Sequence, residues 1–206
     1  MSMLKVGFVD DENTNYVDYA TRLRRHNIEM LFYEGESSVD AIIEWLISEE
    51  ILCLFVDYDL QKKFTQNGTD LVFSINQLLP DFPCIMLTNY PEQSRNEKIV
   101  PKRLIWDREK MSEFDLSEVI DTISNEVEVY LKRKAALSEE YAKLVSERNT
   151  PLFTASDEER LMQLHALFSK YGETDDLPSP LLSSETNKKL DSLINRLTKL
   201  VEKKEE

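Results

Sequence analysis

Polar residues that can bind metal or phosphate directly follow three short, mainly apolar segments of the chain. The segments and the residues that follow them are 4–9 with Asp10 and Asp11, 52–56 with Asp57, and 82–87 with Thr88. Short apolar runs are typical of strands that are buried on both faces of a parallel sheet. Because the carboxyl ends of such strands meet at the edge where open α/β sheets bind ligands, we expect the four side chains to lie together.

Three neighbouring carboxylates have a chemical consequence. They repel one another, which raises their pKa values unless a cation joins them. Carboxylate and carbonyl oxygens suit Mg²⁺, and a hydroxyl opposite Asp57 can hold an anion attached to that residue. The pattern therefore predicts a cation site with an adjoining anion site. The simpler alternative is that Asp57 only begins a turn.

The motif Val-Asp-Asp-Glu at 9–12, followed by strand ends at Asp57 and Thr88, resembles the receiver domain of bacterial two-component response regulators (the CheY-like fold). The resemblance covers roughly residues 3–135. It implies a transient phosphoryl group on Asp57, donated by a histidine kinase. It also implies Mg²⁺ bound by Asp10, Asp11, Asp57 and the backbone carbonyl of Asp59, with Thr88 as the switch hydroxyl that contacts the phosphoryl group.

The sequence departs from the receiver pattern after the fifth predicted strand. Receivers carry a lysine there that pairs with the phosphoryl group, whereas this chain has Asp107-Arg108-Glu109-Lys110. Asp107 aligns most simply with the lysine, and an acid would oppose an added phosphate. Arg108 or Lys110 can reach back instead, and we favour Arg108.

A second departure concerns the aromatic switch that receivers often carry on the fifth strand. The corresponding position here is Leu104 or Ile105, and neighbouring Trp106 is expected to face elsewhere. A phosphorylation switch of the usual kind is therefore not indicated by this strand.

Alternating strand and helix patterns predict an α/β fold, a doubly wound parallel sheet of five strands. The receiver resemblance implies the strand order 2-1-3-4-5. The remaining predicted strands are 28–33 and 103–106, and the predicted helices are 13–26, one capped by Ser37 and Ser38, one from Thr69, and a short one at 92–98.

An all-α, coiled-coil or helical tail is predicted after this sheet. From Leu116 to Leu144 the seam positions are spaced alternately by four and three residues, with Lys134 as the single polar interruption. We therefore divide the chain into a receiver-like domain at 1–135, whose last helix continues to about 149, and a helical extension at 150–206. The extension is predicted to contain helices at 157–171, capped by Ser156, and 184–203, joined by a linker at 173–183.

These tail helices must bury their apolar stripes by packing. We favour a homodimer through helix 115–148. The alternative is a helical hairpin in which the tail packs on the projecting helix of its own chain.

Composition limits the partners. The chain of 206 residues has a net charge of −14, without the basic stripe that nucleic acid or an anionic membrane requires. The lack of an apolar run near 18 residues and of a signal peptide leads us to expect a cytoplasmic protein. If the strands of Cys53 and Cys84 are neighbours in register, their thiols lie at the same level of the sheet, although free buried thiols are favoured over a disulfide.

Three functions were weighed. The first is a non-enzymatic receiver regulator that signals to an unknown protein effector through its helices, or that drains phosphoryl groups as a phosphate sink. The second is a pseudo-receiver, an adaptor that works without phosphorylation. The third is a phosphatase, because Asp57-Tyr58-Asp59 resembles the Asp-x-Asp signature of haloacid-dehalogenase-type enzymes.

Overall fold

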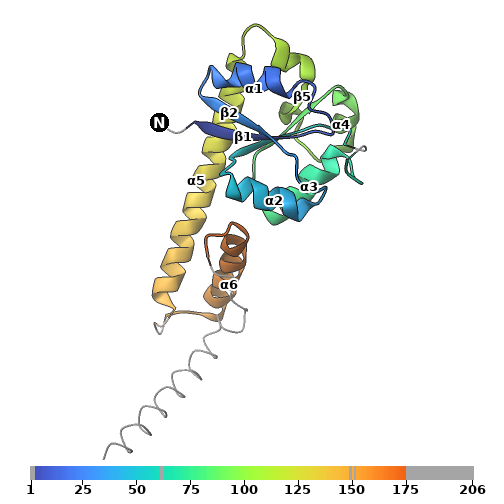
Figure 1. Cartoon of the computed structure of the whole chain (residues 1–206). Coiled ribbons are helices and arrows are strands. Elements are labelled where there is room, and N and C mark those ends of the chain that lie inside the picture. Colours follow the sequence, from blue (N-terminus) through green and yellow to red (C-terminus); the bar gives the residue numbers. More distant parts are fainter. Residues whose placement is uncertain (1–2, 61–62, 149, 151, 175–206) are drawn as a thin grey trace, which may run out of the picture. The chain divides into compact units, whose positions relative to one another are not determined.

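The computed structural model of the chain describes residues 3–60, 63–148, 150 and 152–174 (Figure 1). The chain divides into two compact units between Arg133 and Lys134, a point inside the long helix α5 (Ser117–Glu147). The predicted helix at 184–203, and the linker before it from residue 175 onward, lie outside the described residues.

The first unit contains the predicted five-stranded sheet. All pairings are parallel and the order is β2-β1-β3-β4-β5, which confirms the doubly wound, receiver-like α/β fold. The strands are β1 (Leu4–Val9), β2 (Ile28–Phe32), β3 (Cys53–Val56), β4 (Cys84–Thr88) and β5 (Ile105–Asp107).

The central strands are apolar because helices cover both faces of the sheet. Phe8 of β1, Phe55 of β3 and Ile85 of β4 are fully buried, and every residue of β3 and β4 is buried. In Figure 1, α2 and α3 lie side by side on one face of the sheet and α1 lies on the other. The helices of this unit are α1 (Tyr16–Arg24), α2 (Val39–Ser48), α3 (Gly68–Leu78), α4 (Pro91–Glu97) and the first half of α5.

Two predicted helix starts rest on side-chain caps in the structure. The hydroxyl of Ser38 accepts a hydrogen bond from the backbone N–H of Ala41 at 3.2 Å, as predicted for α2. The side-chain oxygen of Asn67 accepts one from the N–H of Asp70 at 2.9 Å, so α3 begins at Gly68, one residue before the predicted start. Such caps satisfy backbone donors that the first turn of a helix leaves unpaired.

Other boundaries differ from the predictions. The fifth strand is Ile105–Asp107 rather than 103–106, because a 3₁₀ turn at Lys102–Leu104 (η1) follows Pro101. Helix α1 is shorter than 13–26, since a turn in which the N–H of Tyr16 bonds to the carbonyl of Asn13 precedes it.

The two cysteines also lie differently from the expected arrangement. The register pairs Cys84 with Leu54, not with Cys53. Because successive side chains of a strand point to opposite faces, the two buried thiols lie on opposite faces of the sheet.

The second unit contains the end of α5 and helix α6 (Ala155–Lys170), which pack as a helical hairpin. The hydroxyl of Tyr141 lies 2.9 Å from Nδ1 of His165, and the rings of Tyr141 and Phe168 are 5.5 Å apart. The hairpin that we weighed as an alternative to a dimer is therefore present for α6.

The start of α6 corrects a prediction. Thr154, not Ser156, caps the helix in a reciprocal capping box with Asp157.

None of the helices within the described ranges is both long enough and apolar enough to cross a bilayer.

Candidate functional site

The site lies at the carboxyl edge of the sheet, where β1, β3 and β4 end. The register pairs Val9 with Val56, so the residues that follow them, Asp10 and Asp57, are level with each other. The backbone N–H of Asp57 bonds to the carbonyl of Val9 at 3.0 Å, which extends the ladder to the site itself. Thr88 is the last residue of β4.

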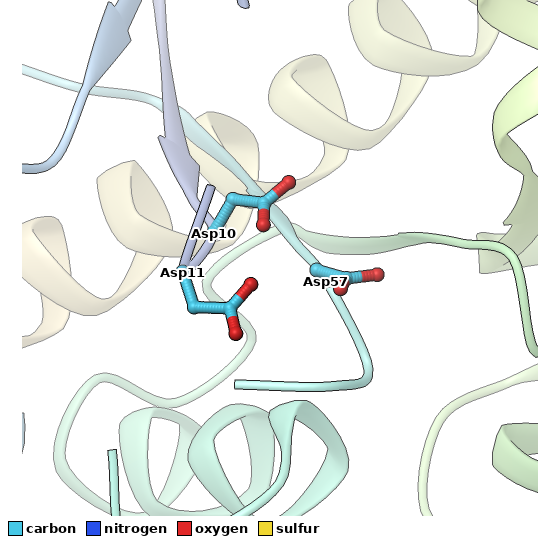
Figure 2. A group of neighbouring side chains, drawn as sticks. All are labelled: Asp10, Asp11 and Asp57. Carbon is cyan, nitrogen blue, oxygen red and sulfur yellow. The ribbon is translucent and has the colours of Figure 1, made fainter. Parts of the chain in front are cut away.

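The structure brings the three predicted carboxylates together. Side-chain oxygens of Asp10, Asp11 and Asp57 all lie within 4.8 Å of one another. Figure 2 shows the three side chains next to one another at the ends of β1 and β3. Asp10 and Asp57 are buried and Asp11 is half-buried, so the cluster has one side open to solvent.

Burial raises the pKa values of Asp10 and Asp57. Loss of hydration raises the pKa of Asp10 from 3.8 to about 6, although the N–H of Glu12 and the charge of Arg108 oppose the rise. Burial also raises the pKa of Asp57, and here the charge of Arg108 is the main opposing influence. Positive charge near Asp10 and Asp57 therefore favours their ionised form, and burial opposes it.

Arg108 is the basic residue that reaches the cluster. Its Nη2 lies 2.7 Å from Oδ2 of Asp10 and 2.9 Å from Oδ2 of Asp57, and its side chain is only 12% exposed. A guanidinium suits this position because its planar fork can serve two oxygens at once.

The residues around Arg108 turn away from the cluster. The ammonium of Lys110 pairs with Glu118 at 2.7 Å and lies 4.8 Å from the centre of the Trp106 ring. Asp107, which aligns most simply with the receiver lysine, is exposed and accepts a hydrogen bond from the N–H of Glu109.

Two buried polar atoms of the site have no hydrogen-bond partner among the described residues. They are Oδ1 of Asp57 and Nε of Arg108. Each such atom costs about 1–3 kcal/mol. A cation beside Oδ1 and an anionic oxygen beside Nε would satisfy both, so the residues present fit a hard divalent cation together with a phosphoryl group.

Thr88 is placed to act on Asp57. Its side chain is buried, and its hydroxyl helps to lower the pKa of the Asp57 carboxyl. The same oxygen accepts a hydrogen bond from the backbone N–H of Tyr90 at 3.0 Å.

Asp59 lies apart from the three clustered carboxylates. Its side chain is exposed in the loop after β3. The assignment of its backbone carbonyl as a metal ligand therefore stays a prediction.

Gly68 belongs to the site, although it was not among the predicted site residues. A Cβ at this position would overlap the backbone carbonyl of Asp57. Glycine is thus required because α3 begins in direct contact with the backbone of Asp57. The Asn-Gly pair at 67–68 indicates a turn in the sequence, but it does not show which residue the glycine contacts.

An open cavity of about 630 Å³ adjoins the acidic cluster. Asp10, Asp11 and Glu12 line one part of it, and Lys63 and Phe32 line another. Asp10 and Asp11 therefore face this cavity, whereas Asp57 is not among its lining residues.

The fold of the first unit is that of solved receiver domains. The signal receiver domain of an HD-domain-containing protein from Pseudomonas fluorescens Pf-5 is similar to this chain at 16% identity, with a TM-score of 0.50. That match covers 66% of this chain and 94% of the other, and at such low identity it shows the fold alone.

Two further solved structures are similar. A response regulator receiver protein from Sinorhizobium medicae WSM419 has 14% identity and a TM-score of 0.45, covering 62% of this chain and 97% of that one. A response regulator from Thermotoga maritima has 16% identity and a TM-score of 0.44, and the match covers 61% of this chain and 98% of that one. No protein-family model matches the chain, and no curated protein matches it either.

Proposed function

We propose that the chain is a cytoplasmic response-regulator receiver protein that a histidine kinase phosphorylates on Asp57 in the presence of Mg²⁺. The observation that carries the proposal is the meeting of Asp10, Asp11 and Asp57 with the guanidinium of Arg108 at one sheet edge. Each of these residues matches a need of phosphoryl transfer, in which positioning and charge stabilisation supply most of the catalysis.

The proposed step is transfer between two side chains. The carboxylate of Asp57 attacks phosphorus, a P–O bond forms, and the P–N bond to the kinase histidine breaks. Mg²⁺, when bound by the three carboxylates and the Asp59 carbonyl, supplies positive charge that offsets the charge of the incoming group. Nε of Arg108, which has no other partner among the described residues, and the hydroxyl of Thr88 then contact the phosphoryl oxygens.

The proposed output is contact with a protein effector through the helices, or drainage of phosphoryl groups from a kinase shared with another regulator. Binding of DNA is not proposed, because a net charge of −14 opposes association with a phosphate backbone. We propose no catalytic turnover beyond the phosphorylation cycle of Asp57 itself.

Intact-mass spectrometry tests this function. The wild-type chain, incubated with Mg²⁺ and acetyl phosphate, is expected to gain one phosphoryl group of about 80 Da. Asp57→Ala should gain nothing. Asp59→Ala is the matched control, since it removes an exposed acid two residues away but keeps the backbone carbonyl, and it should still be modified. A wild-type chain that gains no mass, or an Asp57→Ala chain that does, overturns the proposal.

A phosphorylation-independent pseudo-receiver is the second candidate. It is favoured by Trp106, the only aromatic residue of β5, whose Nε1 donates to the carbonyl of Arg103 at 2.9 Å and whose side chain is buried. A ring held in this way does not supply a mobile switch. The two candidates differ in one result: in the pseudo-receiver, Asp57→Ala leaves capture of the effector unchanged.

A further inference from the structure

Tyr58 connects the residue after Asp57 to the far end of α4. Its hydroxyl donates a hydrogen bond to Oε1 of Glu97, the last residue of α4, at 2.7 Å. The side-chain amide of Asn67 donates to the same oxygen at 3.3 Å. One carboxylate of α4 therefore holds both ends of the loop that leads from Asp57 to α3.

The Tyr58–Glu97 bond is a strong one. A phenol that donates to a carboxylate forms a short, charge-assisted hydrogen bond. The distance of 2.7 Å between the two oxygens fits such a bond. Tyr58 is also tied directly to the site, because it follows Asp57 in the chain and its backbone N–H helps to lower the pKa of the Asp57 carboxyl.

The beginning of α4 is connected to the site by a second path. Tyr90, which precedes the helix, donates its backbone N–H to the hydroxyl of Thr88 at 3.0 Å. The ring centres of Tyr90 and Tyr58 lie 6.5 Å apart, and the two ring planes are tilted at 58° to each other. Both ends of α4 thus contact residues that act on the Asp57 carboxyl, Tyr58 at one end and Thr88 at the other.

Few other interactions hold α4 in place. The helix has seven residues, lacks a side-chain N-cap, and buries only Ser94, whose hydroxyl lies 3.4 Å from that of Thr69. Arg95 adds one contact of 3.4 Å to the carbonyl of Ile105 in β5. Because so short a helix with so little apolar burial has little stability of its own, polar contacts determine where it lies.

Trp106 is poorly suited to move α4. The side chain is 4% exposed, its ring packs on Phe55 at 5.9 Å, and its indole N–H is bonded to Arg103. Tyr58 and Tyr90, in contrast, lie between the site and α4 at the protein surface.

We infer that Tyr58 and Glu97 are positioning residues that couple the chemical state of Asp57 to the placement of α4, in the absence of a mobile aromatic on β5. A phosphoryl group on Asp57 changes the oxygens that the N–H of Tyr58 and the hydroxyl of Thr88 contact. Either change alters the geometry of the Tyr58–Glu97 bond or of the Thr88–Tyr90 bond. The inference rests on the proposed function, and it names the helix whose surface an effector would read.

Hydrogen–deuterium exchange of the peptide that contains α4 tests the coupling. The full chain is measured with Mg²⁺ alone and with Mg²⁺ plus beryllofluoride, a stable mimic of the phosphoryl group. The wild-type chain is expected to show a difference between the two conditions at α4. Tyr58→Phe and Glu97→Ala should each reduce that difference at least about threefold, and the double variant should reduce it no further, because both remove one shared bond.

Tyr33→Phe is the matched control. It removes another tyrosine hydroxyl that makes a 2.7 Å hydrogen bond, to the carbonyl of Glu36, away from α4. This variant should keep the wild-type difference. A merely structural role for Tyr58 would change exchange equally in both conditions and would leave the difference intact, which overturns the inference.

The two proposals fail in different ways. A wild-type chain that gains a phosphoryl group but shows no change at α4 overturns the coupling alone. A wild-type chain that neither gains mass from acetyl phosphate nor responds to beryllofluoride overturns the proposed function, and the coupling with it.

Discussion

Arg108 occupies two of the three carboxylates that the proposed Mg²⁺ site needs. Its guanidinium lies within 2.9 Å of oxygens on both Asp10 and Asp57. A cation that enters the cluster therefore meets a resident positive charge. The arginine stabilises the metal-free site and lowers its attraction for metal at the same time.

Arg108→Ala is expected to tighten Mg²⁺ binding, because it removes a like charge from the site. The gain should be about tenfold in the dissociation constant, or about 1.4 kcal/mol. Without metal the same variant should lose about 3 kcal/mol of unfolding free energy, since two buried carboxylates lose their partner. Isothermal titration calorimetry and urea unfolding measure the two effects.

Lys110→Ala provides the control for Arg108→Ala. It also removes one positive charge, but this charge pairs with Glu118 and lies on the Trp106 ring. Mg²⁺ affinity should stay within about twofold of wild type. An unchanged affinity in Arg108→Ala would show that the arginine and the metal do not compete.

The raised pKa of Asp10 predicts an unusual dependence of stability on pH. Burial places this pKa at about 6 instead of 3.8, so between these values the folded protein holds more protons than the unfolded chain. The free energy of unfolding without metal should therefore fall as the pH rises from about 4 to about 6. If Mg²⁺ binds the ionised carboxylates as proposed, it should oppose this fall.

Urea unfolding at about pH 4 and about pH 7 with a chelator checks the sign. Asp10→Asn lacks the group, so the wild-type curve minus the variant curve isolates its contribution. A difference that grows in favour of the wild type toward pH 7 would contradict the assignment of a raised pKa.

At the scale of single residues, the convergence of Asp10, Asp11, Asp57 and Thr88 could be predicted because apolar runs show where strands end. The Tyr58–Glu97 bond and the contact of Gly68 with Asp57 could not. Both depend on the path of the polar loop between β3 and α3, which has no periodic pattern to read.

Helix α3 is the element most closely fitted to the site. It starts at Gly68 against the carbonyl of Asp57, and the N–H of Gly68 bonds to the carbonyl of Tyr58 at 2.9 Å. Any side chain at its first position must push the helix or the strand end away.

Gly68→Ala is therefore expected to destabilise the chain by about 1–3 kcal/mol and to weaken Mg²⁺ binding through displacement of Asp57. Thermal unfolding and calorimetry check both effects. Gln77→Ala, at an exposed position of the same helix, should change stability by less than about 0.5 kcal/mol. Full Mg²⁺ affinity in Gly68→Ala would mean that the loop adapts without moving the carboxylate.

At the scale of elements, the sequence predicted order and type better than boundaries. The predicted fifth strand begins two residues before the observed one. Arg103 and Leu104 were assigned to the strand, but they belong to the 3₁₀ turn that follows Pro101. Helix α6 starts earlier than predicted because Thr154 and Asp157 form a capping box that Ser156 cannot form.

The whole chain consists of two units that share α5. Part of the predicted heptad seam is covered within each unit: Ile123 and Val127 are buried in the first, and Leu144 is buried in the second. The predicted homodimer through helix 115–148 must therefore use other positions. Leu131 and Val145, two heptads apart on α5, are 42% and 49% exposed.

Sedimentation equilibrium tests that dimer. We expect the wild-type chain to be dimeric and Leu131→Glu/Val145→Glu to be monomeric, because a buried charge is costly in an apolar interface. Val17→Glu, at an exposed apolar position of α1, should remain dimeric. A wild-type chain that sediments as a monomer at about 100 μM would exclude an interface of standard strength.

At the scale of the molecule, fold class and strand order followed from the alternation of strand and helix patterns, together with the receiver resemblance. The packing of the tail did not, since an apolar stripe states that a helix must be covered but not by which partner. The hairpin of α5 and α6 supplies that answer for the described part of the tail.

The two thiols in the sheet allow opening of the sheet to be measured chemically. Cys53 and Cys84 are almost completely shielded, and burial raises the pKa of Cys84 to about 12. Because only an exposed thiolate reacts with alkylating reagents, neither sulfur is modified while the sheet is intact. The rate of alkylation therefore reports how often the sheet opens. Metal or phosphate that stabilises the folded protein would slow alkylation.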